Sequence, residues 1–403
     1  MQFDITILGG GLVGLSAGLA FSRLGLKVAL IEKHAVSIET QTQDWRSLAL
    51  SLTSVHFLSH MGIWQKLKKA AQPISMIDVI EKGKFGVVRL DAAKEGLPAL
   101  GYVVPFALLK SELSQAIHAS TITVFEKNTL KAASLENDHW QLQLSAHTSP
   151  IQSKLLLAAE GTESVLSQSL GIEFETETYG EEAVVARLQV AHAPIGVALE
   201  RFAETGPLAL LPADKNILTL VWALPKFQVL PLMEMSEQDF LTQVQNEVGF
   251  RMGSFKKLLA RQTFPLHFHQ AKSPVGPRLV LLGNSALSLH PVAGQSFNLA
   301  LRNVARLHEV IANAVTQKED FANEATLSAY LAAQKTDVTR TEFFANGLIQ
   351  LFGNNHLKAR MTRRLGFLAL TLVPSAKHYV GKFGSGRLTS LAPLSTPPFE
   401  GKL

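Results

Sequence analysis

The sequence contains no cysteine among its 403 residues. This absence excludes disulfide bonds, thiolate metal sites and a cysteine nucleophile. Long apolar runs are also missing, since the stretch 365–373 is far shorter than the roughly 20 residues that a helix needs to span a bilayer. Charged residues make up only 18% of the chain and apolar residues 47%, which is typical of a globular protein with a large core. We expect no transmembrane helix.

The N-terminal residues lack the features of a secretory signal. They read MQFDITILGG, which begins as a strand instead of as a basic region followed by an apolar one. We therefore expect a cytoplasmic protein. The formal net charge is +5, but the basic residues are scattered and form no nucleic-acid motif. We expect no nucleic-acid partner and no metal site.

The length of the chain favours two interleaved domains, because one core rarely serves so many residues. The opening predicts a βαβ unit, with a strand at 3–8, a helix at 12–25 that ends at Gly25, and a strand at 26–32. Further expected elements are a helix at 47–71, a strand at 85–90, a helix at 111–118, a strand at 151–159, a strand-rich region at 182–224, a strand at 279–283, a helix after Gly294 and helices from Ala325 onward.

A glycine-rich turn follows the first expected strand. Gly9, Gly11 and Gly14 have the G-x-G-x-x-G spacing that lets a backbone approach a pyrophosphate at a helix N-terminus. Glu32 ends the next strand, where a carboxylate can accept hydrogen bonds from a ribose hydroxyl. A turn without a ligand is the alternative, and the motif alone does not choose FAD over NAD.

A second motif stands late in the chain, in LVLLGNSALSLHPVAGQSFNLALRNV at 279–304. It resembles the second FAD motif of the aromatic-hydroxylase flavoproteins, in which a strand ends in Gly-Asp, a proline follows, and a Gly-Gln-Gly-x-Asn turn begins a long helix. The positions that match are Gly283, Asn284, His290, Pro291, Gly294, Gln295, Ser296, Phe297 and Asn298. Asn284 can hydrogen-bond the ribityl chain or a ribose. The helix would direct its N-terminus at the flavin, where negative charge gathers on reduction.

Over nearly its whole length the chain is similar to the 2-octaprenyl-6-methoxyphenol hydroxylase family of ubiquinone biosynthesis. The matching pieces are DWRSLALS around Arg46, GIW at 62–64, LGYVV at 100–104, AAEGTESVL at 158–166 and LERFAETGPLALLP at 199–212. This resemblance implies an FAD-dependent monooxygenase that hydroxylates a polyprenylated phenol with NADH or NADPH and O₂. It also implies an α/β fold, with a Rossmann-like FAD-binding domain interrupted by a β-sheet-rich substrate domain and closed by C-terminal helices.

The resemblance predicts the domain limits and further site residues. The FAD-binding domain is expected at 1–75, 100–178 and 268–345, the substrate domain at 76–99 and 179–267, and the C-terminal helical region at 346–403. Arg46, Glu160 and Gly161 are expected to contact the flavin or the nicotinamide cofactor, although Arg46 in a surface ion pair is an alternative. His290 and Pro291 are candidates to line the substrate cavity.

Some residues depart from the family pattern. Glu160 replaces an aspartate, Ser296 replaces the middle glycine of the second motif, and Asn303 replaces another aspartate. These changes raise a second hypothesis, in which the chain is a catalytically weak flavoprotein that serves as a structural subunit of a ubiquinone-synthesis complex. A third, an NAD-dependent dehydrogenase, is disfavoured by the late FAD motif.

A polyprenylated phenol resides in the membrane, so the sequence also suggests other ubiquinone-biosynthesis proteins as partners and peripheral contact with the inner face of the cytoplasmic membrane. Between Phe343 and Val373, apolar residues are accompanied by Lys358, Arg360, Arg363 and Arg364, as in an interfacial helix. Packing of the same face on the FAD-binding domain is the alternative.

Overall fold

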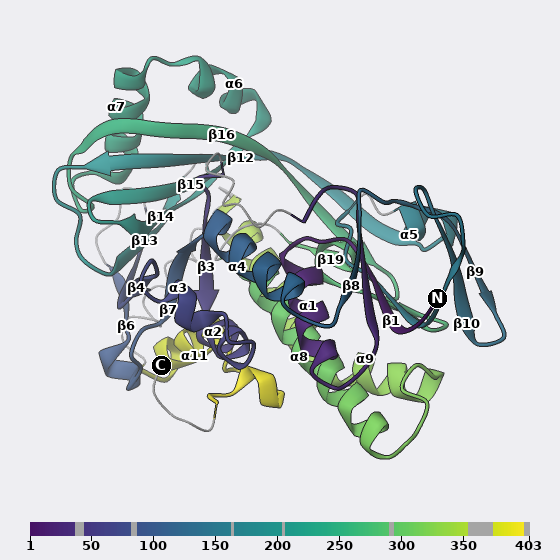
Figure 1. The fold of residues 1–403 in the computed structure, drawn as a ribbon. Coiled ribbons are helices and arrows are strands. Elements are labelled where there is room, and N and C mark those ends of the chain that lie inside the picture. The colour runs from purple at the N-terminus through teal and green to yellow at the C-terminus, as the bar shows by residue number, and fades with distance from the viewer. Residues whose placement is uncertain are drawn as a thin grey trace.

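The computed structural model describes residues 1–36, 44–81, 87–162, 165–203, 206–289, 294–353 and 374–398. They form two large sheets, one small sheet and a set of helices (Figure 1). The fold is the α/β arrangement expected from the sequence, with a Rossmann-like sheet, a second β-rich unit and helices near the C-terminus.

The first large sheet has a parallel centre in the order β18-β11-β1-β2-β8, with β17 antiparallel at one end and the hairpin β9–β10 joined to β11. Its strands are β1 (Gln2–Leu8), β2 (Val28–Glu32), β8 (Thr123–Glu126), β9 (Leu130–Glu136), β10 (His139–Leu144), β11 (Ile151–Ala158), β17 (Val275–Gly276) and β18 (Leu279–Leu281). The central strands are almost wholly buried, as expected of a parallel sheet that helices cover.

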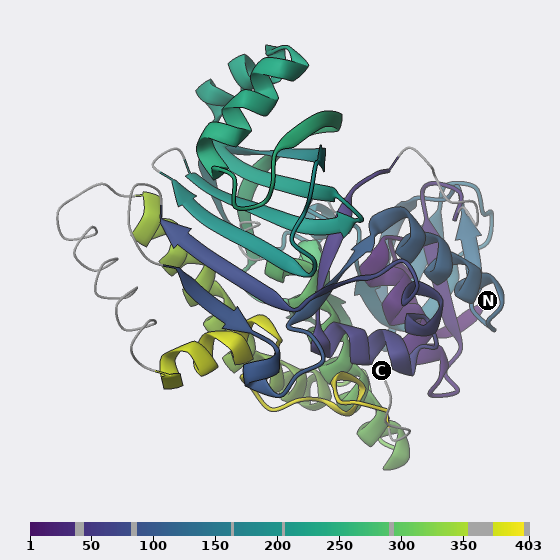
Figure 2. The same ribbon diagram turned by 90° about the vertical axis from the view of Figure 1, so that its left-hand side faces the viewer.

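The second large sheet follows the order β19-β16-β12-β15-β14-β13-β5-β6. Its strands are β5 (Met76–Glu81), β6 (Val88–Asp91), β12 (Phe174–Val190), β13 (Val197–Ala203), β14 (Gly206–Asp214), β15 (Ile217–Pro225), β16 (Phe255–Ala271) and β19 (Leu287–Ser288). Two helices, α6 (Lys226–Glu234) and α7 (Glu237–Val248), cover its outer face (Figure 2). The division of the chain into domains at the stated limits remains a prediction.

A small three-stranded sheet, β3-β7-β4, contains β3 (Ser47–Ser51), β4 (Gln72–Ile74) and β7 (Gly101–Pro105). The remaining helices are α1 (Leu12–Ser22), α2 (Leu52–His60), α3 (Trp64–Leu67), α4 (Phe106–His118), α5 (Val165–Ser169), α8 (Gln295–Thr316), α9 (Glu324–Gly353) and α11 (Pro374–Gly384), with short 3₁₀ turns η1 (Ala93–Glu95), η2 (Gly283–Ser285) and η4 (Pro393–Ser395). The main core lies between the first sheet and α1, α4 and α8. None of the described helices is both long and apolar enough to cross a membrane.

The prediction that residues 47–71 are helical holds for 52–60 and 64–67 but is wrong for 47–51. Residues 47–51 form β3, which pairs with β7, and only then does the chain turn helical. Ser51 caps α2 by accepting a hydrogen bond from the backbone N–H of Ser54, and Gly62 ends the helical stretch with a φ of +74°. A small residue with a capping hydroxyl thus divides a segment whose apolar pattern alone looked continuous. Likewise α1 ends at Ser22, short of Gly25.

Candidate functional site

The turn between β1 and α1 uses its three glycines in different ways. A Cβ on Gly9, which has a φ of +100°, would lie 2.5 Å from the carbonyl oxygen of Ala159, and a Cβ on Gly14 would lie 1.9 Å from that of Gly9. Both positions therefore admit no side chain, because the backbone itself occupies the space. A Cβ on Gly11 would meet nothing within 4 Å. The turn is thus closed on the protein side and open at its second glycine, where the motif places a phosphate.

Glu32 stands at the end of β2 beside this turn. Its carboxylate accepts hydrogen bonds from the backbone N–H of Gly10 and, at 3.0 Å, from that of His34. These two donors fix the half-buried side chain next to the glycines. A carboxylate has about four acceptor positions, so this arrangement leaves capacity for a ribose hydroxyl.

Two further turns lie at the same edge of the sheet. The one after β11 contains Gly161, whose φ is +90°, and the one after β18 contains Gly283, whose φ is +59°. Ser285 joins them, because its hydroxyl accepts from the N–H of Gly161 at 2.9 Å and donates to the Gly161 carbonyl at 3.0 Å. A Cβ on Gly283 would lie 3.0 Å from the side chain of Val13 on α1, so the third turn also packs on the first. The carboxyl ends of parallel strands are where such sheets bind ligands.

Glu160 and Asn284, the other predicted site residues of these turns, have exposed side chains. Both therefore stand at the surface of the sheet edge where the three turns converge. Their contact with a cofactor stays a prediction.

The second predicted motif surrounds the start of α8. Gly294 is the N-cap with a φ of +57°, and Gln295 is only 5% exposed. The hydroxyl of Ser296 donates to the carbonyl of Leu289 at 3.4 Å, and Phe297 packs against the main core. The serine that departs from the family pattern is thus accommodated by a weak contact within the protein.

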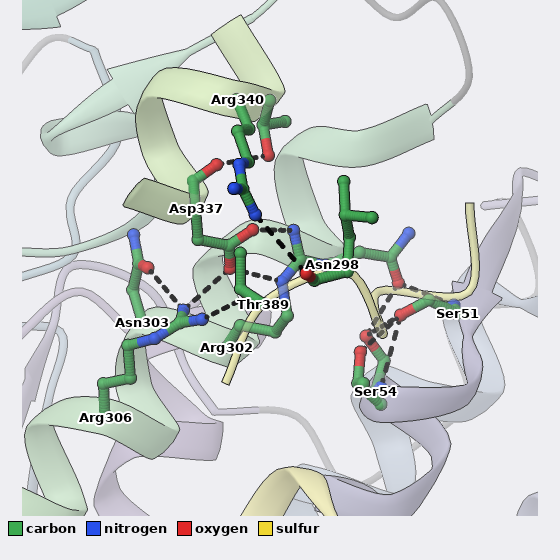
Figure 3. A network of polar contacts seen from close by, with 12 residues as sticks. Ser51, Ser54, Asn298, Arg302, Asn303, Arg306, Asp337, Arg340 and Thr389 are labelled. Atoms are coloured by element: carbon green, nitrogen blue, oxygen red, sulfur yellow. Dashed lines mark hydrogen bonds and ion pairs between the residues drawn. The ribbon is translucent and has the colours of Figure 1, made fainter. Parts of the chain in front are cut away.

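The side chain of Asn298 makes four hydrogen bonds within the protein. Its side-chain oxygen accepts from the Ser51 N–H at 2.8 Å and from the Ser54 hydroxyl at 2.7 Å (Figure 3). Its side-chain nitrogen donates to the carbonyls of Ala49 and Gly294, both at 2.9 Å. An amide side chain has two acceptor and two donor positions, so all four are used by the protein. Asn298 therefore fixes α8 to the β3–α2 junction, and its side chain has no position left for a ligand.

Arg46 directly precedes β3 and lies between the start of α4 and strand β16 of the second large sheet. It forms a two-pronged ion pair with Asp44 at 2.8 and 2.6 Å, and its guanidinium lies over the rings of Phe106 and Phe264, 4.5 and 5.3 Å from their centroids. The hydrogen bond between the pair lowers the pKa of Asp44 and raises that of Arg46. The alternative of an ion pair is therefore present, and contact of Arg46 with a cofactor stays a prediction. His290 and Pro291 lie outside the described residues.

The two helices that begin at this site suit a negatively charged ligand. Both α1 and α8 start at a glycine without a side-chain hydrogen bond to the cap, and neither has an acidic residue in its first turn. Their first N–H groups thus remain as donors, and the helix dipole favours an anion beside them. Together with the open face of Gly11, this arrangement fits a dinucleotide such as FAD.

The fold and the glycine turns define a flavoprotein of the aromatic-hydroxylase class. The FAD binding domain family matches residues 2–342, so the chain belongs to this family of FAD-dependent monooxygenases, which use NAD(P)H. The structure resembles that of p-nitrophenol 4-monooxygenase PnpA from Pseudomonas putida, with a TM-score of 0.77 at 14% identity over 96% of this chain and 98% of that one. It also resembles PqsL from P. aeruginosa, with a TM-score of 0.75 at 16% identity over 88% and 97% of the two chains.

Among curated proteins, the chain is 32% identical to the uncharacterized protein slr1300 of Synechocystis, over 98% of this chain and 96% of that protein. It is 29% identical to 3-demethoxyubiquinol 3-hydroxylase of Escherichia coli, over 95% and 98%, and 28% identical to the ubiquinone hydroxylase UbiL of Rhodospirillum rubrum, over 96% and 90%. The prediction of an FAD-dependent monooxygenase is confirmed. The similarity to ubiquinone hydroxylases is also confirmed, without singling out one ring position.

The sequence interpretation missed one residue that builds the site and the structural role of another. Ser285 directly follows the Gly-Asn pair, but nothing in the spacing reveals a partner 124 positions away. The anchoring role of Asn298 was also hidden, because its partners lie in β3 and α2, which were expected to form a single helix.

Proposed function

We propose that this protein hydroxylates the ring of a polyprenylated phenol in ubiquinone biosynthesis, using NAD(P)H and O₂. The observation that carries this proposal is the similarity over nearly the whole chain to proteins named as ubiquinone hydroxylases. FAD, when bound, supplies the electron transfer and the oxygen chemistry of the reaction.

The residues of this chain have binding and orienting roles in the proposal. The turn at Gly9, Gly11 and Gly14 would hold the diphosphate, since its middle glycine is open and α1 begins there without a cap. Glu32, already oriented by two backbone donors, would accept from a ribose hydroxyl. Gly161 and Gly283 would bring backbone to the ribityl side.

The start of α8 would contribute the flavin side of the site. Gly294, Gln295, Ser296 and Phe297 form its first turn, and Asn298 holds that turn in place through four hydrogen bonds. The N-terminal dipole of α8 would favour negative charge on the flavin ring. The proposal adds cofactor contacts from Asn284, Glu160 and Arg46. It also assigns substrate binding to the domain expected at 76–99 and 179–267, which contains most of the second large sheet.

The test is anaerobic reduction of the FAD-loaded protein by NADH and by NADPH, with and without a prenylated phenol, followed by admission of O₂. We expect faster flavin reduction when the phenol is present, and a product heavier by one oxygen atom in mass spectrometry. Reduction that ignores the phenol, with no oxygenated product, would contradict the proposal.

A second candidate is a catalytically weak subunit of a ubiquinone-synthesis complex, motivated by Glu160, Ser296 and Asn303. In the structure the side chain of Asn303 accepts a long hydrogen bond, 3.5 Å, from Arg306. This candidate predicts that the loaded flavin stays inert in the reduction assay while the chain still associates with other enzymes of the pathway. Co-purification of such enzymes with an inert flavoprotein would favour it.

Peripheral membrane attachment through the segment 343–373 remains part of the proposal, and the structure describes only the beginning of this segment. Phe343 is 80% exposed, whereas the ring of Phe344 packs on that of Phe383 in α11, with centroids 4.0 Å apart. The basic residues Lys358, Arg360, Arg363 and Arg364 lie outside the described residues. Flotation with anionic liposomes at low and high salt, with these arginines changed to glutamate, tests the attachment. Equal flotation of the two proteins would speak against it.

A further inference from the structure

A polar stripe runs down the buried side of α8. Asn298, Arg302 and Arg306 are four residues apart, so they stand one above another on the same face of the helix. Their exposed fractions are only 2%, 2% and 4%. Asn298 ties α8 to the β3–α2 junction (Figure 3). The two arginines contact α9, and Arg306 also contacts Thr389 in the C-terminal segment.

The two arginines share one carboxylate. Arg302 contacts Asp337 of α9 through Nε at 2.7 Å and Nη2 at 3.3 Å, and Arg306 contacts the same carboxylate at 2.8 Å. The other partners of Arg306 are neutral, namely Asn303, the Thr389 hydroxyl and the Ser390 carbonyl. Among the described residues, the ion pairs of this stripe therefore contain two positive charges, on Arg302 and Arg306, and one negative charge, on Asp337.

The excess charge is well buried. Burial by itself would raise the pKa of Asp337, but the guanidinium groups of Arg302 and Arg306 hold it below its ordinary value, so the carboxylate is ionised. Nη1 of Arg302 has no hydrogen-bond partner among the described residues. Packing alone does not explain this arrangement, because apolar side chains of similar volume fill such a space without the penalty of burying an unpaired charge.

The position of the excess charge relates it to the start of α8. Arg302 is seven residues beyond Gln295, which is about 10 Å along a helix axis. The helix dipole already makes the N-terminus positive, and a buried positive charge behind the first turn acts in the same sense. A flavin at this end of α8, as the proposed function places it, gains negative charge when it is reduced.

We propose that Arg302 and Arg306, held by Asp337, are positioning residues that favour reduced over oxidised FAD at the start of α8. They act through the helix, by holding it against α9 and by leaving one positive charge unbalanced. This inference rests on the proposed location of the flavin. It goes beyond that proposal because it assigns a redox role to two buried residues that are not among the proposed cofactor contacts.

The test is a pair of variants with opposite changes in charge. Arg302→Gln removes the excess positive charge, and Asp337→Asn adds another. For each, the ratio of the dissociation constants of oxidised and reduced FAD is obtained from an anaerobic redox titration of bound and free flavin. We expect this ratio to fall in Arg302→Gln and to rise in Asp337→Asn, each by the order of tenfold for a unit charge at about 10 Å and an effective dielectric constant of about 20.

The opposite signs separate an electrostatic role from a structural one, because both substitutions disrupt the same ion pair and should both lower the thermal stability. If Asp337→Asn does not fold, Arg302→Lys takes its place: it keeps the charge, so only Arg302→Gln should change the ratio. Shifts of the same sign in Arg302→Gln and Asp337→Asn, or an unchanged ratio in Arg302→Gln, would overturn the inference.

Asp320→Asn is the matched control. Asp320 also holds an arginine in a two-pronged pair, with Arg278 at 2.6 and 3.3 Å, but it follows the far end of α8. That helix has 22 residues and is about 33 Å long. The control should lose stability without changing the redox ratio. A wild-type protein that binds no FAD would refute the proposed function instead, whereas FAD binding without these shifts would refute only this inference.

Discussion

Two alanine substitutions in the first glycine turn, at Gly11 and at Gly14, can distinguish an effect on ligand binding from an effect on folding. Gly11 has a φ of −73°, which any residue adopts, and a Cβ there meets nothing within 4 Å. Gly11→Ala should therefore change the free energy of unfolding of the FAD-free protein by only about 0.5 kcal/mol, within the range of a surface substitution. The added methyl would occupy the space through which a phosphate approaches the backbone.

We expect Gly11→Ala to weaken FAD binding at least about tenfold, which corresponds to about 1.4 kcal/mol. Gly14→Ala is the matched variant, because its Cβ would lie 1.9 Å from the Gly9 carbonyl oxygen and force α1 away from the turn. Overpacking of this kind costs about 1–3 kcal/mol, so this variant should lose both stability and FAD. The assays are thermal unfolding of the FAD-free proteins and titration with FAD followed by flavin fluorescence. Wild-type FAD affinity in a stable Gly11→Ala protein would refute the assignment of this turn as the phosphate site.

Two further predictions concern α8. Asn298→Ala should lower the free energy of unfolding by at least about 2 kcal/mol, because four backbone and side-chain groups lose their buried partner. Thr316→Ala, at the exposed end of the same helix, is the control and should change the free energy of unfolding little. Equal midpoints of the two variants in urea titrations would contradict the anchoring role of Asn298. Burial lowers the pKa of His308 to about 4, below the ordinary 6.5, so the unfolded chain binds one more proton between these values and stability should fall as the pH drops from 6.5 to 4. Stability curves of His308→Gln should be flatter over this window by up to about 3 kcal/mol, whereas the exposed His192→Gln should follow the wild type.

Local patterns made the first half of the site predictable. The strand, the glycine spacing and the helix of the βαβ opening are adjacent in the chain, and each glycine occupies a position that its neighbours dictate. Glu32 could be placed for the same reason, since the strand that carries it pairs directly with β1. Sequence periodicity is sufficient where the contacts that matter are local.

Non-local contacts account for what was missed. The segment 47–71 has helix-like apolar spacing, but residues 47–51 gain a partner in β7, at least 50 positions away, and become a strand. Asn298 was expected to bind the cofactor because it stands in the second motif, but its side-chain contacts with β3 and with Ser54 of α2 depend on non-local packing that the motif does not reveal. The spacing of Asn298, Arg302 and Arg306 was visible in the sequence, but their burial and the shared carboxylate of Asp337 depend on how α9 packs.

The site also explains how a large second sheet can interrupt the FAD-binding fold without separating its parts. Gly161 and Ser285 belong to turns that are 124 positions apart, and five of the eight strands of the second sheet, β12 to β16, lie between them in the chain. They meet because β11 and β18 are parallel neighbours, so their carboxyl ends emerge side by side. The register of this one strand pair is therefore sufficient to place the two turns, and the hydroxyl of Ser285 then locks them together with two hydrogen bonds. Changes within the second sheet can therefore leave the position of these two turns intact.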